Sequence, residues 1–171
     1  MKRLPAGALK ALKIAHVVCA QVWLGSVVAV FFYGLHCFNS GLGGPAAAEM
    51  VGLIPTLYQR VVLPFGVAMI VQGLVYGLFS QYGFVRLRWI RIKWILMFFV
   101  MILTGAGSIR SVLETIRKLN AGEITSLAPS DGLQFFVFVA GQIALLCTIT
   151  AISVLKPKDG KAGNGKTAAA N

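Results

Sequence analysis

The residue in this sequence best able to do chemistry is a histidine inside an apolar segment. His16 lies near the start of the apolar run 14–38, and Trp23 and Gly25 follow it in the string His-Val-Val-Cys-Ala-Gln-Val-Trp-Leu-Gly. An ionisable side chain in a segment long enough to span a bilayer is costly in lipid. We therefore expect His16 to face protein or trapped water, either at a functional site or as a hydrogen-bonded structural histidine.

A second basic side chain, Lys93, lies one turn after Trp89 in another apolar segment. His16, Cys19 and Trp23 follow one another at helical spacings that put them on one face of a helix. We predict that His16, Trp23 and Lys93 form a cofactor-binding cluster that faces the interior of a helix bundle. The alternative for Lys93 is that its ammonium group extends to the lipid headgroups.

Haem b and copper are the cofactors that such residues could hold. The chain has two histidines, His16 and His36, and they are twenty residues apart on one expected helix, or about 30 Å. They cannot be the two axial ligands of one haem within a single chain, so a haem would use His16 alone or with a Met or Lys. For Cu(I), the soft donors are Cys37, next to His36, and the thioethers of Met97 and Met101.

The composition places these residues in a membrane protein. The chain has 171 residues, of which 57% are hydrophobic and 12% charged, and its mean hydropathy is +0.79. A span requires about 20 mostly apolar residues. Four stretches qualify, at about residues 10–36, 61–81, 89–110 and 133–155. The first has no small-residue cleavage site after it, so we expect a retained helix rather than a secretory signal.

The basic residues predict the orientation of these spans. Twelve of the 16 Lys and Arg residues lie in three regions: before or in the first turn of the first span, in the loop before the third span or its first turns, and after the fourth span. The positive-inside rule then places both termini in the cytoplasm, as an even number of spans requires. Because the basic residues lie between apolar stretches rather than on one face, they do not indicate a nucleic-acid binder. We expect a multi-pass protein of a bacterial-type cytoplasmic membrane.

The expected fold is all-α: an antiparallel four-helix bundle, with residues 1–157 as a single domain and 158–171 as a disordered cytoplasmic tail. The stretch 46–58 is expected to form an outer helix leading into the second span, with bends at Pro55 and Pro64. Beyond the third span, apolar residues recur at helical spacing and Glu114 lies four residues before Lys118, so an amphipathic extension should end near residues 120–122. Asp131, with its neighbour Ser130, offers a cap for the fourth span.

Two further patterns concern the interior of the bundle. Gln21, Gln72 and Gln142 each lie near the middle of a span, and we expect them to point inward and to bond to one another or to Thr104 and Ser108. They are either structural or line a polar pathway. The glycines of the stretch 73–77, with Gly66 one heptad earlier, form a small-xxx-small pattern that is typical of helix packing.

Short motifs resemble the CopD-like superfamily of membrane proteins, which includes copper-resistance proteins, HemJ-type protoporphyrinogen oxidases and small proteins of unknown function. The first is the string from His16 to Gly25, and the second is Trp89-Ile-Arg-Ile-Lys93 at the start of the third span. The resemblance covers about residues 10–110. The HemJ-type members have Leu-Pro-Arg-Leu where this chain has Phe-Tyr-Gly-Leu35, and a histidine in the third helix that this chain lacks. The resemblance thus points to the small four-span members.

The sequence therefore predicts a small integral membrane protein without identifying a reaction. One alternative is a haem- or copper-associated redox or metal-handling protein that uses His16. The other is a non-catalytic subunit that docks a membrane protein partner, and a homo-oligomer is a further form of association. Enzyme classes are not favoured, because no Ser-His-Asp set can be placed and the Gly-rich stretch 41–44 lacks the Lys-Ser/Thr of a phosphate-binding loop.

Overall fold

The computed structural model describes residues 5–79 and 88–155, and in these ranges all regular structure is helical. Four helical stretches are long and apolar enough to cross a membrane: Gly7–Phe38, Gly44–Phe79, Arg88–Asn120 and Pro129–Leu155. The predicted all-α class and the four candidate spans are therefore confirmed. The end of the predicted second span, residues 80–81, and the predicted tail 158–171 lie outside the described residues.

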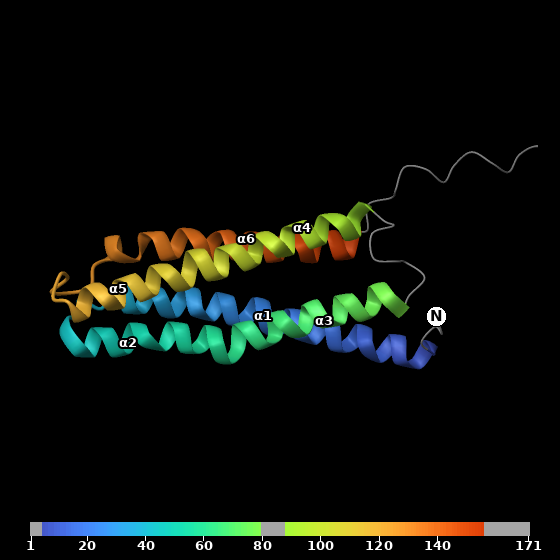
Figure 1. The fold of residues 1–171 in the computed structure, drawn as a ribbon, viewed down its shortest axis with the longest axis horizontal. Helices are drawn as coiled ribbons and strands as arrows, with labels where there is room; N and C mark the ends of the chain where they lie inside the picture. The colour runs from blue at the N-terminus through green and yellow to red at the C-terminus, as the bar shows by residue number, and fades with distance from the viewer. Residues whose placement is uncertain (1–4, 80–87, 156–171) are drawn as a thin grey trace, which may run out of the picture.

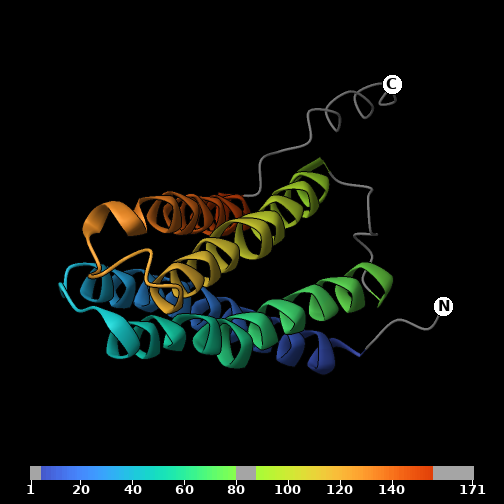
Figure 2. The same ribbon diagram turned by 60° about the vertical axis from the view of Figure 1, so that its left-hand side comes forward.

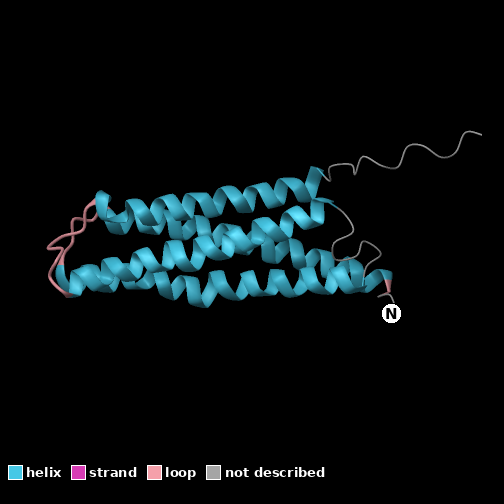
Figure 3. Ribbon diagram, turned by 45° about the horizontal axis from the view of Figure 1, so that its top comes forward, coloured by secondary structure: helices cyan, strands magenta, loops and turns pink. Residues whose placement is uncertain are grey.

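Each stretch is a nearly continuous helix, and loops connect the helices at one end (Figure 3). The first stretch is α1 (Ala6–Phe38). The second contains α2 (Gly44–Leu57), the π-helical segment η1 (Tyr58–Val62) and α3 (Leu63–Phe79). The third contains α4 (Arg88–Ile102), the π-helical segment η2 (Leu103–Ile109) and α5 (Arg110–Asn120). The fourth begins with the 3₁₀ turn η3 (Pro129–Gly132) and continues as α6 (Leu133–Leu155).

The four stretches lie side by side along the long axis of the molecule (Figure 1). The loops 39–43 and 121–128 share one end, here called the looped end; the start of α1 and the end of α6 lie at the other, here called the N-terminal end. α2 packs against α5 near the looped end, whereas α3 and α4 diverge toward the N-terminal end (Figure 2). The bundle is thus tighter at the looped end.

Burial follows the same gradient. The largest fully buried side chains include Phe38, Ile54, Tyr58 and Phe135, all in the half near the looped end. Large apolar side chains cover the outside of the helices instead, and Phe98 is 65% exposed. Exposed apolar area on this scale suits a lipid environment, because a soluble monomer rarely leaves large apolar patches open to water. The interior residues therefore lie in a narrow, mostly apolar core, and the outer surface of the bundle is compatible with lipid.

The loops at the looped end are joined by backbone contacts. The Leu127 N–H donates to the Leu42 carbonyl oxygen at 2.7 Å. Next to this bond, the Cα of Gly43 lies against the Thr125 carbonyl, so closely that a side chain there would collide with backbone. Asp131 Oδ2 accepts from the N–H of Ala128 at 2.9 Å, so the predicted capping residue bonds to the backbone of the turn before α6.

The amphipathic extension of the third stretch is confirmed, because α5 ends at Asn120, and Gly122 follows with a φ of 71°. The direct ion pair of Glu114 is with Arg117, while Lys118 acts on Glu114 through its charge. Arg117 bridges two carboxylates, with Glu114 Oε1 at 2.9 Å and Glu123 Oε1 at 2.8 Å. Because Glu123 lies in the loop after α5, this second bond holds the loop against the helix.

The predicted bends at the two prolines take a different form. Pro55 lies inside α2, where it has no N–H to donate to the preceding turn. The chain nevertheless continues as one helix, and the π-helical segment η1 occupies positions 58–62 between Pro55 and Pro64. η2 in the third stretch has no proline, and no sequence pattern predicted it. π-Helical turns are rare and occur often at functional sites.

Candidate functional site

His16 lies half-buried on the side of α1 that faces α3. Its ring centroid is 6.3 Å from that of Tyr76, with an interplanar angle of 70°. The Gln72 side chain lies beside the imidazole, and its Nε2 donates to Cys19 Sγ at 3.5 Å. His16 and Cys19 thus share one helical face, as their spacing predicts, and α3 supplies the groups that meet them.

Two buried atoms in this cluster have no hydrogen-bond partner: His16 Nδ1 and Gln72 Oε1. They complement each other, because a protonated Nδ1 donates and an amide oxygen accepts. If the two side chains turned toward each other, this pairing would place the proton on Nδ1. His16 Nε2 would then carry a lone pair, which is the form of imidazole that ligates a metal or accepts a proton.

Trp23 lies on the same face of α1, two turns nearer the looped end. It is 4% exposed. A Cβ placed on Gly66 of α3 would lie 3.3 Å from its indole ring, so Gly66 makes the room that the ring occupies. The indole Nε1 is also buried without a partner. The structure therefore packs Trp23 against α3 at a different level from His16 rather than against the imidazole.

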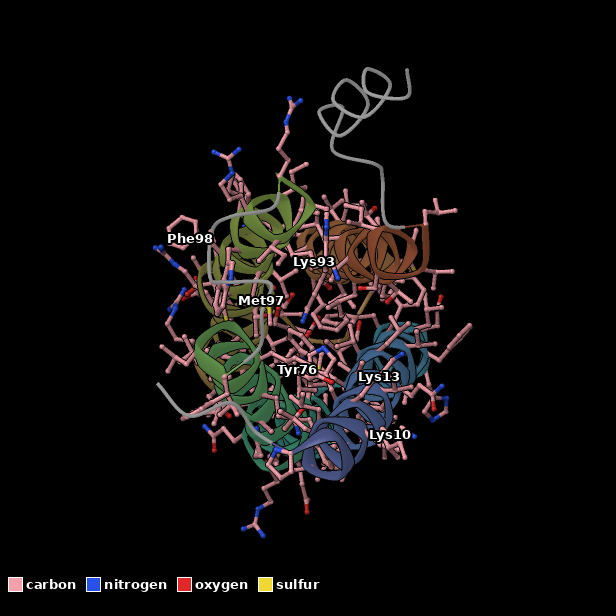
Figure 4. The ribbon with its side chains drawn as sticks, turned by 90° about the vertical axis from the view of Figure 1, so that its right-hand side faces the viewer. Lys10, Lys13, Tyr76, Lys93, Met97 and Phe98 are labelled. Atoms are coloured by element: carbon pink, nitrogen blue, oxygen red, sulfur yellow. The ribbon has the colours of Figure 1, made fainter. Side chains whose placement is uncertain are left out.

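Lys93 lies on α4 near the N-terminal end and is half-buried. Its Nζ is 4.7 Å from the centroid of the Trp89 ring, a cation–π distance. Figure 4 shows that Lys93, Met97 and Tyr76 point between the helices, whereas Phe98 points away from them. Lys93 is close enough for its charge to act on His16. A cation, an imidazole and a phenol ring from three helices thus share this end of the interior.

Tyr76 belongs to this cluster although the sequence reasoning did not single it out. Its hydroxyl donates to the Leu9 carbonyl at 3.0 Å, which ties α3 to the first turns of α1. The available signal was its spacing, since Tyr76 follows Gln72 by four residues and shares its helical face.

The glycine of this region also packs as expected: a Cβ on Gly73 would lie 3.6 Å from the ring of Trp94 in α4.

The residues proposed for copper are not gathered into one site. His36 is exposed, whereas its neighbour Cys37 is buried with Sγ 3.9 Å from the Met50 carbonyl. Met97 is half-buried and Met101 is 39% exposed. Within residues 5–79 and 88–155, no three His, Cys, Asp or Glu side chains lie together in a way that could hold a metal.

The prediction for the three glutamines is wrong in part. Gln72 and Gln142 point inward, but Gln21 is exposed on the opposite side of α1 from His16. Gln142 bonds to neither of the other two, because its Oε1 accepts from the Tyr58 hydroxyl at 3.2 Å. Central position in a span does not reveal which side of the helix a residue occupies.

The functional assignment rests on these contacts. They place a half-buried histidine, a cation and aromatic rings at one end of a membrane-compatible bundle. Comparison of the chain with protein-family models, with curated proteins and with solved structures finds no match.

Proposed function

We propose that the chain is a small CopD-like membrane protein that binds an acidic, largely apolar ligand at the His16 cluster, with b-type haem as the ligand. The four helices cross a bacterial-type cytoplasmic membrane in antiparallel order, and both termini are cytoplasmic. The predominance of basic residues on that side supports this orientation. The observation that carries the proposal is the half-buried imidazole of His16, whose Nδ1 lies unpartnered beside an amide acceptor.

The residues present fit a haem with one protein ligand. His16 Nε2 would hold the iron, and Gln72 Oε1 would accept from Nδ1–H and orient the ring. The Lys93 ammonium would pair with a propionate, while Tyr76 and Met97 supply aromatic and polarizable apolar contacts. His36 cannot contribute, because both histidines lie on the single helix α1. When bound, the iron would supply electron transfer or the binding of a small ligand.

The test is titration of haemin into the purified full chain in a mild detergent. We expect a Soret band from bound haem that saturates near one equivalent. His16→Ala should remove this band, and His36→Ala is the matched control that should keep it. Lys93→Gln should weaken binding about ten- to hundredfold, the effect of losing one charge-assisted hydrogen bond.

Each variant is first compared with the parent by helical circular dichroism and elution volume, so that loss of haem is not loss of fold. Absence of haemin binding in the parent chain would remove the proposal. Equal binding by the His16→Ala protein would show that haem associates elsewhere.

A second candidate function, association with another copy of the chain, is favoured by Gln21. This side chain is exposed near the middle of α1, where an amide in lipid has no partner. Gln21, Gly25 and Ala29 are spaced four residues apart and form an exposed stripe along α1. The space beside Gly25 is open, because no atom lies within 4 Å of a Cβ built on it. We propose that two α1 helices pack along this stripe and that their Gln21 amides bond to each other.

Sedimentation equilibrium in mild detergent tests this association. We expect a dimer that Gln21→Leu weakens about three- to thirtyfold, the effect of an interhelical hydrogen bond in a membrane. Gln59→Leu removes an exposed amide from a different helix and should leave the dimer unchanged. A monomeric parent chain, or a dimer that is insensitive to Gln21→Leu, would exclude this interface.

A further inference from the structure

A second group of polar residues lies deep in the bundle, near the looped end and well away from His16. It contains Gln142 of α6, Tyr58 of η1 and Ser108 of η2. Gln142, Tyr58 and Ser108 are each 0% exposed. Tyr58 precedes Gln72 by fourteen residues on one continuous stretch, which corresponds to about 21 Å along the helix axis. This group is therefore separate from the His16 cluster and is independent of the proposed function.

Both π-helical segments of the described chain meet at this group. η1 begins at Tyr58, and η2 contains Thr104 and Ser108. η2 runs along α6, since a Cβ on Gly107 would lie 2.6 Å from the Phe138 ring and one on Gly141 would lie 3.4 Å from Leu103. A π-turn closes its hydrogen bonds between residues five apart instead of four, and such turns are frequent at functional sites. Here the two segments bring polar side chains from two helices toward a third.

The hydrogen bonds of the group leave one donor unused. The Tyr58 hydroxyl donates to Gln142 Oε1 at 3.2 Å, but Gln142 Nε2 is buried with no acceptor. An amide N–H₂ without a partner in a membrane interior costs several kcal/mol. Natural structures rarely retain such a group unless water or a ligand satisfies it.

Acceptors that can share a ligand with Gln142 lie on η2. The Ser108 hydroxyl donates to the Leu103 carbonyl at 3.2 Å, so its oxygen keeps lone pairs that can accept. The Ser108 side chain also lies against the Tyr58 phenol, the same group that bonds to Gln142. Thr104 Oγ1 similarly donates to the Val100 carbonyl at 2.8 Å. A molecule that accepts from Gln142 Nε2 and donates to Ser108 Oγ completes the group.

We propose that Gln142, Tyr58 and Ser108 form a buried binding site for one water molecule in the half of the bundle near the looped end. Water has the required chemistry, because it accepts from an amide N–H and donates to a hydroxyl oxygen at once. The ligand is uncharged, since no buried residue of the described chain carries a charge that could compensate an ion. The site thus hydrates the bundle at a depth where most core residues are apolar.

Solid-state NMR of the full chain in lipid bilayers tests this site. The protein is labelled with ¹⁵N-glutamine, and magnetisation is transferred from water to the side-chain amides. We expect transfer to Gln142 at a rate comparable to that of the exposed Gln134. Gln142→Met, which keeps the volume but not the amide, assigns the resonance by its loss.

Ser108→Ala removes the acceptor on η2 and should cause loss of the transfer to Gln142 while the amide signal remains. Thr148→Ala is the matched control, because the Thr148 hydroxyl also bonds to its own helix, at 2.8 Å, but is exposed. It should leave the transfer unchanged. The proposal is overturned if the parent protein shows no transfer from water to Gln142. It is equally overturned if the amide correlates with lipid acyl protons instead, since the ligand is then a lipid oxygen.

Discussion

The contact between η2 and α6 makes a quantitative prediction at Gly107. A Cβ at this position would lie 2.6 Å from Cδ1 and Cγ of Phe138 and 3.1 Å from its Cβ. Ordinary contacts between carbon atoms are about 3.5 to 4.0 Å, so the ring must move by roughly 1 Å. Its Cβ is fixed to the α6 backbone and cannot rotate away. Overpacking of this kind costs about 1 to 3 kcal/mol.

Gly105 provides the matched control. It lies two residues away in the same π-helical segment, is exposed, and has no atom within 4 Å of a Cβ built on it. Both replacements by Ala gain about 0.5 to 1 kcal/mol from the lower backbone entropy of the unfolded chain. We therefore expect Gly107→Ala to destabilise the protein by up to about 2.5 kcal/mol net, whereas Gly105→Ala should stabilise it by about 0.5 to 1 kcal/mol.

Reversible unfolding in mixed micelles, followed by circular dichroism, measures the difference between these two variants. Because both changes add the same methyl group in the same segment, their difference isolates the contact with Phe138. A Gly107→Ala protein no less stable than the parent chain would refute the packing of η2 against α6. Two equally destabilised proteins would instead indicate that the π-helical segment itself requires glycine.

Three other changes test separate parts of the structure. The hydrogen bond from Arg117 lowers the pKa of the exposed Glu123. The Arg117–Glu123 pair therefore holds the loop fully at pH values above the unfolded-state pKa of Glu123. This attachment is lost as the pH falls through the lower folded-state pKa. The hydrogen-exchange protection factors of the loop 121–127, which are corrected for the intrinsic pH dependence of exchange, should therefore fall in acid, and Arg117→Gln should remove that fall. Gly43→Ala should loosen the contact between the two loops and lower the thermal midpoint, whereas Gly52→Ala, with open space around its Cα, should not. Tyr58→Phe removes the donor to a buried amide oxygen and should cost about 1 to 3 kcal/mol in the same unfolding assay.

Hydropathy and helical spacing predicted the elements well, because both depend on local sequence. The length of the apolar runs is sufficient to locate four helices in a bilayer, and the stripe in residues 109–119 is sufficient to extend the third helix to Asn120. The spacing of His16, Cys19 and Trp23 likewise places them on one face. None of these inferences required knowledge of which helices are neighbours.

The errors arose where the answer depends on neighbours or on small changes of helical register. Gln21 and Gln142 are both central in apolar spans, yet one is exposed and the other fully buried. The sequence around Gln21 has apolar residues on every side, so no amphipathic pattern indicates which side faces protein. The π-helical segments were hard to predict for a similar reason. One extra residue per turn changes the direction of the Tyr58, Thr104 and Ser108 side chains without any change in composition. Pro55 gave a signal for η1, but η2 has no such marker.

Some interior polar groups have hydrogen-bond partners within the protein and others do not, and this difference distinguishes residues that pack from residues that can bind a ligand. Cys37 and Thr104 each bond to backbone carbonyls and are satisfied within the protein. By contrast, the buried side-chain atoms without partners in the described chain belong to His16, Gln72, Trp23 and Gln142, and all four residues face the bundle interior. A membrane core offers no bulk solvent to hydrogen-bond with these atoms. Each atom therefore requires a ligand, a bound water or a change of rotamer that supplies a partner. At His16 and Gln72 a donor and an acceptor that lack partners belong to neighbouring side chains, and pairing them would leave the other imidazole nitrogen for the proposed ligand. At Gln142 the surplus is an amide donor, which no rotation of Gln72 can reach from about 21 Å away along the axis. The two proposed sites therefore explain the unsatisfied atoms of His16, Gln72 and Gln142 better than one continuous polar pathway does.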